Sequence, residues 1–178
     1  MEHIERIHRE LKYTGSMLEF YTDTIKVPNG NTAKWDFINH HGAAAVLPVT
    51  DEGKIVLVRQ YRNALDRETL EIPAGGLNGA DEPTRTAAIR ELEEETGFRA
   101  DSIEPLISVV TAVAFCNEVI DVYLATGLHQ FAQKLDEEEF IEVEAYTVEE
   151  LTDMIFAGTI QDSKTVAAVM AYAYQQKK

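Results

Sequence analysis

The chain has one cysteine, one tryptophan and no long apolar run among its 178 residues. Cys116 has no second cysteine with which to form an internal disulfide, which fits a reducing compartment. A transmembrane helix needs about 18 or more consecutive apolar residues, so none is expected. The opening MEHIERIHRELK is charged and lacks the apolar centre of a secretion signal. We therefore expect a cytoplasmic protein.

Positive charge is also scarce. The chain holds 16 lysines and arginines against 31 acidic residues, a net charge of −15. This balance argues against nucleic-acid polymers and anionic membranes as partners. It leaves room for a small anionic substrate, because bound cations and local arginines can reverse the field at a site.

The most informative segment is Gly76–Phe98, GLNGADEPTRTAAIRELEEETGF, a glycine loop that leads into a helix. A helix advances about 100° per residue. With Glu91 at zero, Glu95 falls near about 40° and Glu94 near about 300°, so the three carboxylates share one face. Like charges at this spacing oppose helix formation by a few tenths of a kcal/mol per pair. A hard divalent cation bound by carboxylate oxygens is the natural compensation.

This segment resembles the Nudix box, a glycine, five residues, a glutamate, seven residues, and then Arg-Glu-aliphatic-any-Glu-Glu-any-Gly-aliphatic. The matching positions are Gly76, Glu82, Arg90, Glu91, Leu92, Glu94, Glu95 and Gly97. Only Phe98 departs, where an aliphatic residue is usual. Segments 54–62, 68–75, 119–128 and 136–146 are similar to the ADP-ribose pyrophosphatase branch of that family. The resemblance thus covers most of the chain after residue 40.

The resemblance and the pattern together predict an α/β/α Nudix sandwich with a mixed β-sheet, an α+β or α/β fold, over residues 42–178. Residues 1–41 form a separate segment, in which Pro28–Asn31 contains an Asn-Gly turn between the β-rich stretches 16–27 and 32–40. An antiparallel hairpin alone is marginal and must pack on something. Its exposed edge favours pairing with a second copy, so we expect a homodimer formed through this hairpin.

Regular elements are expected at regular intervals after the hairpin. Asp81 or Glu82 is expected to cap the box helix, with Pro83 in its first turn and Gly97 just past its end. The capping box Thr147–Glu150 predicts a second helix, ending near residue 158. A third helix is expected over 163–175. The expected strands are 43–49, 54–61, 69–72, 106–113, 118–125 and 140–146.

The resemblance implies a metal site on the box helix. Glu91, Glu94 and Glu95 would hold two or more Mg²⁺ or Mn²⁺ ions, with help from the backbone carbonyl of Gly75, and Glu95 also counts as catalytic. Arg90 is expected to pair with the neighbouring carboxylates and fix their orientation. Without the resemblance, the same charges would read as a solvated helix face.

The acidic run 137–139 supplies the candidates for activating the attacking water. By itself this run reads as solvated surface. The resemblance implies that a glutamate of this loop folds over the metals, and by position before Ile141 the candidates are Glu139 and then Glu137. A base on a loop suggests closure when substrate binds.

Four further residues are candidates for substrate binding. Arg62 corresponds to an arginine that contacts substrate in the resembling family, although a surface salt bridge is an equal alternative. Glu71 lies just before the glycine loop, where relatives bind substrate. Arg59 precedes Arg62 by three residues and should therefore face the other way on a strand. Trp35 is either a core residue or an aromatic that stacks on adenine.

The resemblance implies a metal-dependent hydrolase of nucleoside-diphosphate sugars, with ADP-ribose as the first choice and AMP and ribose 5-phosphate as products. ADP-ribose members usually carry a run like Ser-Pro-Gly-Phe-Ser-Asn-Glu, and here Val113 and Ala114 replace its proline and glycine. Another nucleotide sugar, such as GDP-mannose or an ADP-hexose, or a dinucleoside polyphosphate therefore stays open. Outside the enzyme class, a sensor that binds nucleotide sugars without turnover is the alternative.

Overall fold

The structure is a computed structural model that describes residues 3–16, 18–79 and 81–177. The chain divides into two compact units. The first comprises Met1–Gly42 and Val110–Val119, and the second comprises Ala43–Val109 and Ile120–Lys178. The first unit thus includes a segment from the middle of the chain, beyond the predicted 1–41. The use of the hairpin of this unit in dimerisation stays a prediction.

The first unit contains a three-stranded antiparallel sheet in the order β1-β2-β3. Its strands are β1 (Glu5–Thr14), β2 (Glu19–Lys26) and β3 (Thr32–Asn39). The predicted hairpin is confirmed as β2 and β3, joined by a turn in which Gly30 has a φ of 86°. Strand β1 was not predicted, because its side chains are almost all exposed and its sequence lacks an apolar alternation.

The segment Val110–Val119 pairs with the end of β3. The backbone N–H of Ile38 donates to the carbonyl of Phe115 at 2.7 Å, and that of His40 donates to Oδ1 of Asn117 at 2.7 Å. The run in which the proline and glycine are replaced therefore belongs to the first unit. Val113 is 82% exposed there.

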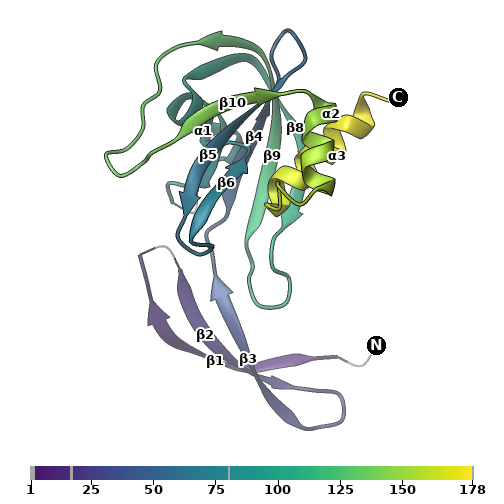
Figure 1. The fold of residues 1–178 in the computed structure, drawn as a ribbon. Helices are drawn as coiled ribbons and strands as arrows, with labels where there is room; N and C mark the ends of the chain where they lie inside the picture. Colours follow the sequence, from purple (N-terminus) through teal and green to yellow (C-terminus); the bar gives the residue numbers. More distant parts are fainter. Residues whose placement is uncertain (1–2, 17, 80, 178) are drawn as a thin grey trace. The chain divides into compact units, whose positions relative to one another are not determined.

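The described residues of the second unit form two sheets and three helices. Figure 1 shows their arrangement. The sheets have the orders β10-β5-β6 and β7-β4-β9-β8. Strand β4 is antiparallel to β7 but parallel to β9, which confirms a mixed sheet. The strands are β4 (Ala43–Pro48), β5 (Ile55–Arg62), β6 (Arg67–Glu71), β7 (Ala74–Gly76), β8 (Phe98–Val110), β9 (Val119–Gln130) and β10 (Glu142–Tyr146). The helices are α1 (Thr84–Thr96), α2 (Val148–Phe156) and α3 (Ser163–Gln175).

The layers follow from the alternation of strand side chains. Every residue of β4 is buried, because the strand is covered on both faces. Ala45 and Leu47 pack in one core with Leu151 of α2 and Val169 of α3. The intervening residues of β4, such as Val46, pack in a second core with α1. Helices α2 and α3 thus cover one side of the sheets and α1 covers the other, the predicted sandwich (Figure 1).

The helix ends agree with the sequence except at the start of α1. Pro83 occupies the N-cap of α1 and supplies no side-chain bond, so the expected cap by Asp81 or Glu82 is wrong. Glu82 instead accepts a hydrogen bond from the backbone N–H of Asn78. Gly97 ends the helix with a φ of 70°, as predicted. The capping box of α2 is confirmed, with both of its hydrogen bonds formed.

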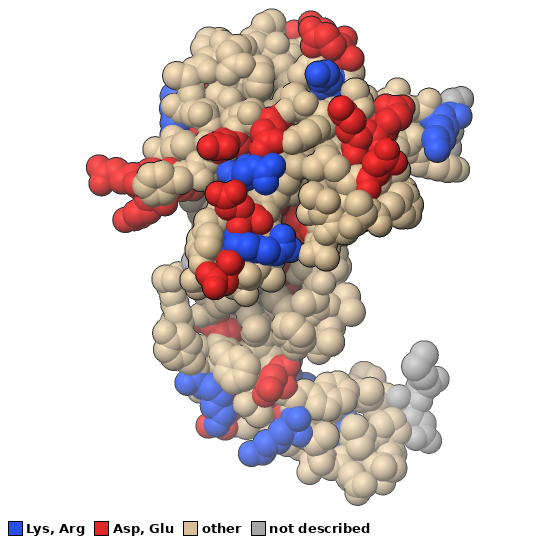
Figure 2. All heavy atoms as spheres, viewed as in Figure 1, with Lys and Arg blue, Asp and Glu red and all other residues tan. Residues whose placement is uncertain are grey.

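The surface carries the expected acidic charge. On the viewed face of the second unit, acidic side chains cover more area than basic ones (Figure 2). Among the described residues, no helix combines the length and the apolar character needed to cross a membrane.

We predict that Gly97→Ala destabilises the fold more than Gly53→Ala. Both glycines have positive φ, 70° and 79°, so both changes cost about 1–2 kcal/mol of backbone strain. A Cβ at Gly97 would also lie 2.5 Å from the carbonyl oxygen of Phe131, whereas one at Gly53 would meet nothing within 4 Å. Urea unfolding should show a difference of at least about 1 kcal/mol between the variants. Equal losses would contradict the close contact at the end of α1.

Candidate functional site

The site is built on the face of α1 that is turned toward β4 and β7. Ala88 and Leu92 pack into the core beneath the helix, and this fixes the rotation of α1 about its axis. Glu91 and Glu95 are then buried, with 8% and 4% of their surface exposed, while Glu94 is half-buried. Two carboxylates of the predicted face are therefore withdrawn from water.

Arg90 joins the glutamates of α1 to the loop before the helix. Its Nη1 donates to Glu91 at 2.5 Å and to Glu94 at 3.3 Å. Its Nη2 donates to the carbonyl of Gly76 at 3.1 Å and to Glu82 at 3.3 Å. Burial lowers the pKa of Arg90, but the bonds and charges of Glu82 and Glu91 raise it overall, so the guanidinium stays charged. The expected pairing of Arg90 with neighbouring carboxylates is thus present.

The loop Ala74–Gly76 lies against the same carboxylates. The backbone N–H of Ala74 donates to Oε2 of Glu95 at 3.0 Å. A Cβ placed on Gly75 would lie 2.1 Å from Oε1 of Glu91, so any other residue here would displace the Glu91 carboxylate. The backbone of Gly75 and the Glu91 carboxylate therefore share one small space, the arrangement expected if both contribute to one ion site.

Burial and mutual repulsion favour the protonated form of the two buried acids. Desolvation is the largest cause that raises the pKa of Glu95, to about 8, and the charge of Glu91 adds to it. The pKa of Glu91 is also raised by desolvation, against the opposing effect of Arg90. Two acids held this way store an unfavourable electrostatic energy that a divalent cation would relieve.

The donor set suits a hard cation, although its oxygens point elsewhere in this conformation. Within residues 3–16, 18–79 and 81–177, no three His, Cys, Asp or Glu side chains already converge as a metal cluster. The cause is visible in the contacts, since Glu91 and Glu94 bond to Arg90 and Glu95 bonds to the N–H of Ala74. Carboxylate and carbonyl oxygens are the ligands that Mg²⁺ and Mn²⁺ prefer.

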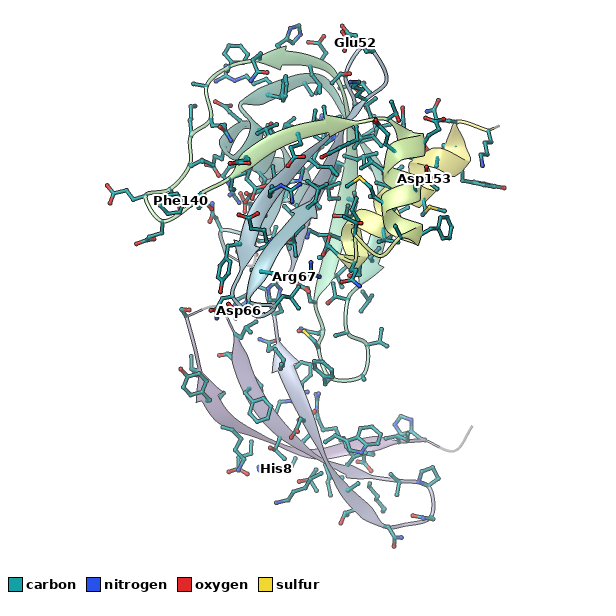
Figure 3. The ribbon with its side chains drawn as sticks, in the orientation of Figure 1. His8, Glu52, Asp66, Arg67, Phe140 and Asp153 are labelled. Carbon is teal, nitrogen blue, oxygen red and sulfur yellow. The ribbon has the colours of Figure 1, made fainter. Side chains whose placement is uncertain are left out.

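The acidic loop before β10 reaches this carboxylate cluster through Glu139. Its charge contributes to the raised pKa of both Glu91 and Glu95. Glu139 is exposed, and its carboxylate accepts a hydrogen bond from the backbone N–H of Asp136 at 3.1 Å. Glu137, two residues earlier on the same loop, is also exposed. Next to Glu139, Phe140 is 84% exposed and points away from the sheet (Figure 3).

The start of this loop is fixed to the end of α1, which the sequence did not suggest. The side-chain amide of Gln133 donates to the carbonyl of Glu95 at 2.6 Å and to that of Ile141 at 3.5 Å. The backbone N–H of Lys134 donates to the carbonyl of Glu94 at 3.0 Å. The loop that carries Glu139 therefore begins at the helix that carries the other glutamates.

Arg59 and Arg62 face opposite ways, as expected. Nε of Arg59 donates to Glu144 of β10 at 2.6 Å. Arg62 donates to both carboxylate oxygens of Glu71, at 2.8 and 2.7 Å, and the charge of Glu95 adds to the raised pKa of Arg62. The structure thus brings Arg62 and Glu71 together near the carboxylates of α1 and turns Arg59 away from them.

Two other features lie apart from the carboxylates. Trp35 sits on β3 of the first unit with 48% of its surface exposed, so it is not a core residue. Its contact with a base stays a prediction. A cavity of about 490 Å³ in the second unit is lined by residues such as Thr96, Phe98 and Val143, and its lining contains none of Glu91, Glu94 and Glu95.

Sequence comparison finds relatives over nearly the whole chain. A methanol dehydrogenase activator of Bacillus methanolicus is 41% identical over 96% of this chain and 92% of its own length. An ADP-ribose pyrophosphatase of Bacillus subtilis is 40% identical over 92% of this chain and 89% of its own length. An ADP-ribose pyrophosphatase of Mycobacterium tuberculosis is 35% identical over 94% and 82%, respectively.

The fold is also similar to that of a solved structure. A crystal structure of an ADP compounds hydrolase superposes with a TM-score of 0.86 at 18% identity, covering 98% of this chain and 94% of that one. The NUDIX domain family matches residues 39–169, which include the glycine loop, α1 and the acidic loop. With that match, and with relatives above 30% identity along most of its length, this chain belongs to the Nudix family.

Proposed function

We propose that this protein hydrolyses the diphosphate bond of a nucleoside-diphosphate sugar, with ADP-ribose as the first-choice substrate and AMP and ribose 5-phosphate as products. The observation that carries the proposal is the set of glutamates on α1, of which Glu91 is buried against the backbone of Gly75 and Glu95 is buried against that of Ala74. The two ADP-ribose pyrophosphatases at 40% and 35% identity support the substrate class.

The roles follow from position. Glu91, Glu94, Glu95 and the carbonyl of Gly75 would hold two or more Mg²⁺ or Mn²⁺ ions. Such ions neutralise charge on a diphosphate and lower the pKa of bound water. Arg90 bonds to Glu91 and Glu94, so it would steady these carboxylates once their other oxygens turn toward the ions.

Two parts of the second unit would act on the substrate itself. Glu139 would take the proton of the attacking water when its loop closes, and Glu137 is the second candidate for this role. Arg62 would bind a phosphate oxygen beside Glu71, because a guanidinium suits a diphosphate. Arg59 is bound to Glu144 on the other side of the strand, so the proposed substrate site does not include it.

Two substituted residues bear on the identity of the sugar nucleotide. Val113 and Ala114 lie in the first unit, exposed, where relatives of the ADP-ribose branch carry proline and glycine. GDP-mannose, an ADP-hexose and a dinucleoside polyphosphate therefore remain alternatives. A homodimer, with Trp35 stacking on the base, and a cytoplasmic location complete the proposal.

A second candidate is activation of a dehydrogenase. It is favoured by the 41% identity to the methanol dehydrogenase activator, which is as high as the identity to either pyrophosphatase. Adding the purified chain to a methanol dehydrogenase and following alcohol oxidation separates this candidate from hydrolysis of free nucleotide sugars.

A substrate panel tests the hydrolase proposal. In an assay coupled to a phosphatase, we expect more phosphate release from ADP-ribose than from the other nucleotide sugars, and only with Mg²⁺ or Mn²⁺ present.

Glu95→Gln should lower turnover by about 10²-fold or more, because the amide is a poor ligand and base. Glu93→Gln is the matched control on the same helix, since Glu93 pairs with Arg99 and Lys134 instead. If no substrate releases phosphate, the hydrolase proposal is refuted, and a sensor that binds nucleotide sugars without turnover becomes the alternative.

Stabilisation by Mg²⁺ should grow with pH. The pKa of Glu95 is raised to about 8, so without metal its contribution to stability is present at low pH and is lost as pH rises through about 8. Metal requires the ionised carboxylate and must displace that proton at lower pH. The rise in melting temperature with Mg²⁺ should therefore be larger at pH 8.5 than at pH 6.5. Glu95→Gln should flatten this dependence, and an equal rise at both pH values in the unaltered protein would contradict it.

The two loop glutamates should differ sharply. Glu139→Gln is expected to lower kcat by about 10²-fold or more, the usual contribution of a general base, because its charge reaches Glu91 and Glu95. Glu137→Gln, two residues away on the same loop, should keep kcat close to that of the unaltered protein. Single-turnover kinetics with saturating Mg²⁺ measures both variants, and the reverse ranking would assign the base to Glu137.

A further inference from the structure

Glu71 is a buried carboxylate at the end of β6 whose two oxygens each accept two hydrogen bonds. Only 3% of its surface is exposed. Oε1 accepts from Nε of Arg62 at 2.8 Å and from Thr69 at 2.6 Å. Oε2 accepts from Nη2 of Arg62 at 2.7 Å and from Nζ of Lys164 at 2.5 Å. One carboxylate therefore has two cationic partners, one from β5 and one from α3.

Lys164 is an unusual residue for its place. It lies in the first turn of α3, where the helix dipole disfavours a cation, and only 6% of its surface is exposed. Burying an ammonium is costly unless it is paired. Its partners are Glu71 and the N-cap residue Asp162, whose Oδ2 lies 3.0 Å from Nζ. These two carboxylates offset the cost of burying the Lys164 ammonium at the start of a helix.

Arg62 is the member of this group that reaches solvent. Its side chain is 40% exposed, against 4% for that of Glu71 and 8% for that of Lys164. Its guanidinium also lies within the electrostatic reach of Glu95 on α1. Arg62 is therefore the cation that a bound diphosphate can recruit, but both its Nε and Nη2 are committed to Glu71.

A diphosphate must compete with Glu71 for Arg62. If Arg62 were the sole cation beside Glu71, its departure would leave a buried carboxylate without a charged partner, which is strongly unfavourable. Lys164 removes that penalty, because it stays bound to Glu71 when the guanidinium turns toward the ligand. Asp162 and Thr165 fix the start of α3 against β6, since the hydroxyl of Thr165 accepts from the backbone N–H of Ile72 at 2.9 Å.

We propose that Lys164 is a positioning residue that serves as the permanent counter-ion of Glu71 and so frees Arg62 to bind the diphosphate of the substrate. The inference rests on the proposed hydrolysis of nucleoside-diphosphate sugars. It assigns substrate affinity to a residue of α3 that would not touch the substrate.

Steady-state kinetics on ADP-ribose with saturating Mg²⁺ tests the assignment in the full chain. Lys164→Met should raise KM about tenfold or more, because Glu71 then retains Arg62, and should change kcat less than about threefold. Lys164→Arg restores the cation and should recover most of the affinity. Ser163→Ala, at the exposed residue that directly precedes Lys164, should keep KM within about twofold and serves as the control at the start of α3.

A double variant separates positioning from a general structural loss. In the background of Glu71→Gln the side chain needs no counter-ion, so adding Lys164→Met should leave KM unchanged. Urea unfolding of every variant checks that the fold persists. An unchanged KM in a folded Lys164→Met protein, or a full additional KM increase in the double variant, would overturn the inference alone. If the unaltered chain hydrolyses no nucleotide sugar, the proposed function fails and the inference falls with it.

Discussion

The guanidinium of Arg90 is the interaction on which the rest of the site depends. It is the cation that lies among Glu82, Glu91 and Glu94 and also binds the carbonyl of Gly76. Glu91 and Glu94, about one turn apart on α1, would otherwise repel one another, and Gly76 would lose its bond to the helix. One side chain thus neutralises the acidic face in part and ties the loop to it. The remaining charge, on Glu95 above all, is what a divalent cation would satisfy.

A second group in which one charged side chain is shared by several partners surrounds Glu71. There two cations serve one buried acid, whereas at Arg90 one cation serves several acids. Arg62 is the partly exposed member of the Glu71 group, and its guanidinium lies within the electrostatic reach of Glu95 on α1. The fold thereby presents a cluster of acids for metal and a releasable arginine for phosphate within one unit. A double-sided core around β4 holds both in place, because α1 packs on one of its faces and α3 on the other.

Local signals in the sequence predicted the parts of this fold that depend on local geometry. The glutamate spacing placed Glu91 and Glu95 on one face of α1, and Gly97 and the Thr147–Glu150 box marked helix ends, as observed. The cap at Asp81 or Glu82 failed because Glu82 is drawn to Asn78 and Arg90 instead. That competition is between residues of a folded loop, and a propensity argument cannot weigh it.

The parts that the sequence did not yield depend on contacts between distant segments. Lys164 lies in the first turn of an apolar helix, where a lysine is usually solvated, yet it is buried against Glu71, which is far away in the chain. Strand β1 has no apolar alternation, and its place is set by pairing with β2. The preference for Glu139 over Glu137 came from the resemblance, and its proximity to Glu91 and Glu95 became visible only in three dimensions.

The most direct test of the central claim is a calorimetric titration of Mg²⁺ and Mn²⁺ into the purified chain, alone and with a non-hydrolysable ADP-ribose analogue. If the carboxylates of α1 bind divalent ions, the titration should show saturable ion binding that becomes tighter with the analogue. This binding should be lost when Glu91 and Glu95 are both changed to glutamine. No uptake of either ion by the unaltered chain, with or without the analogue, would contradict the account.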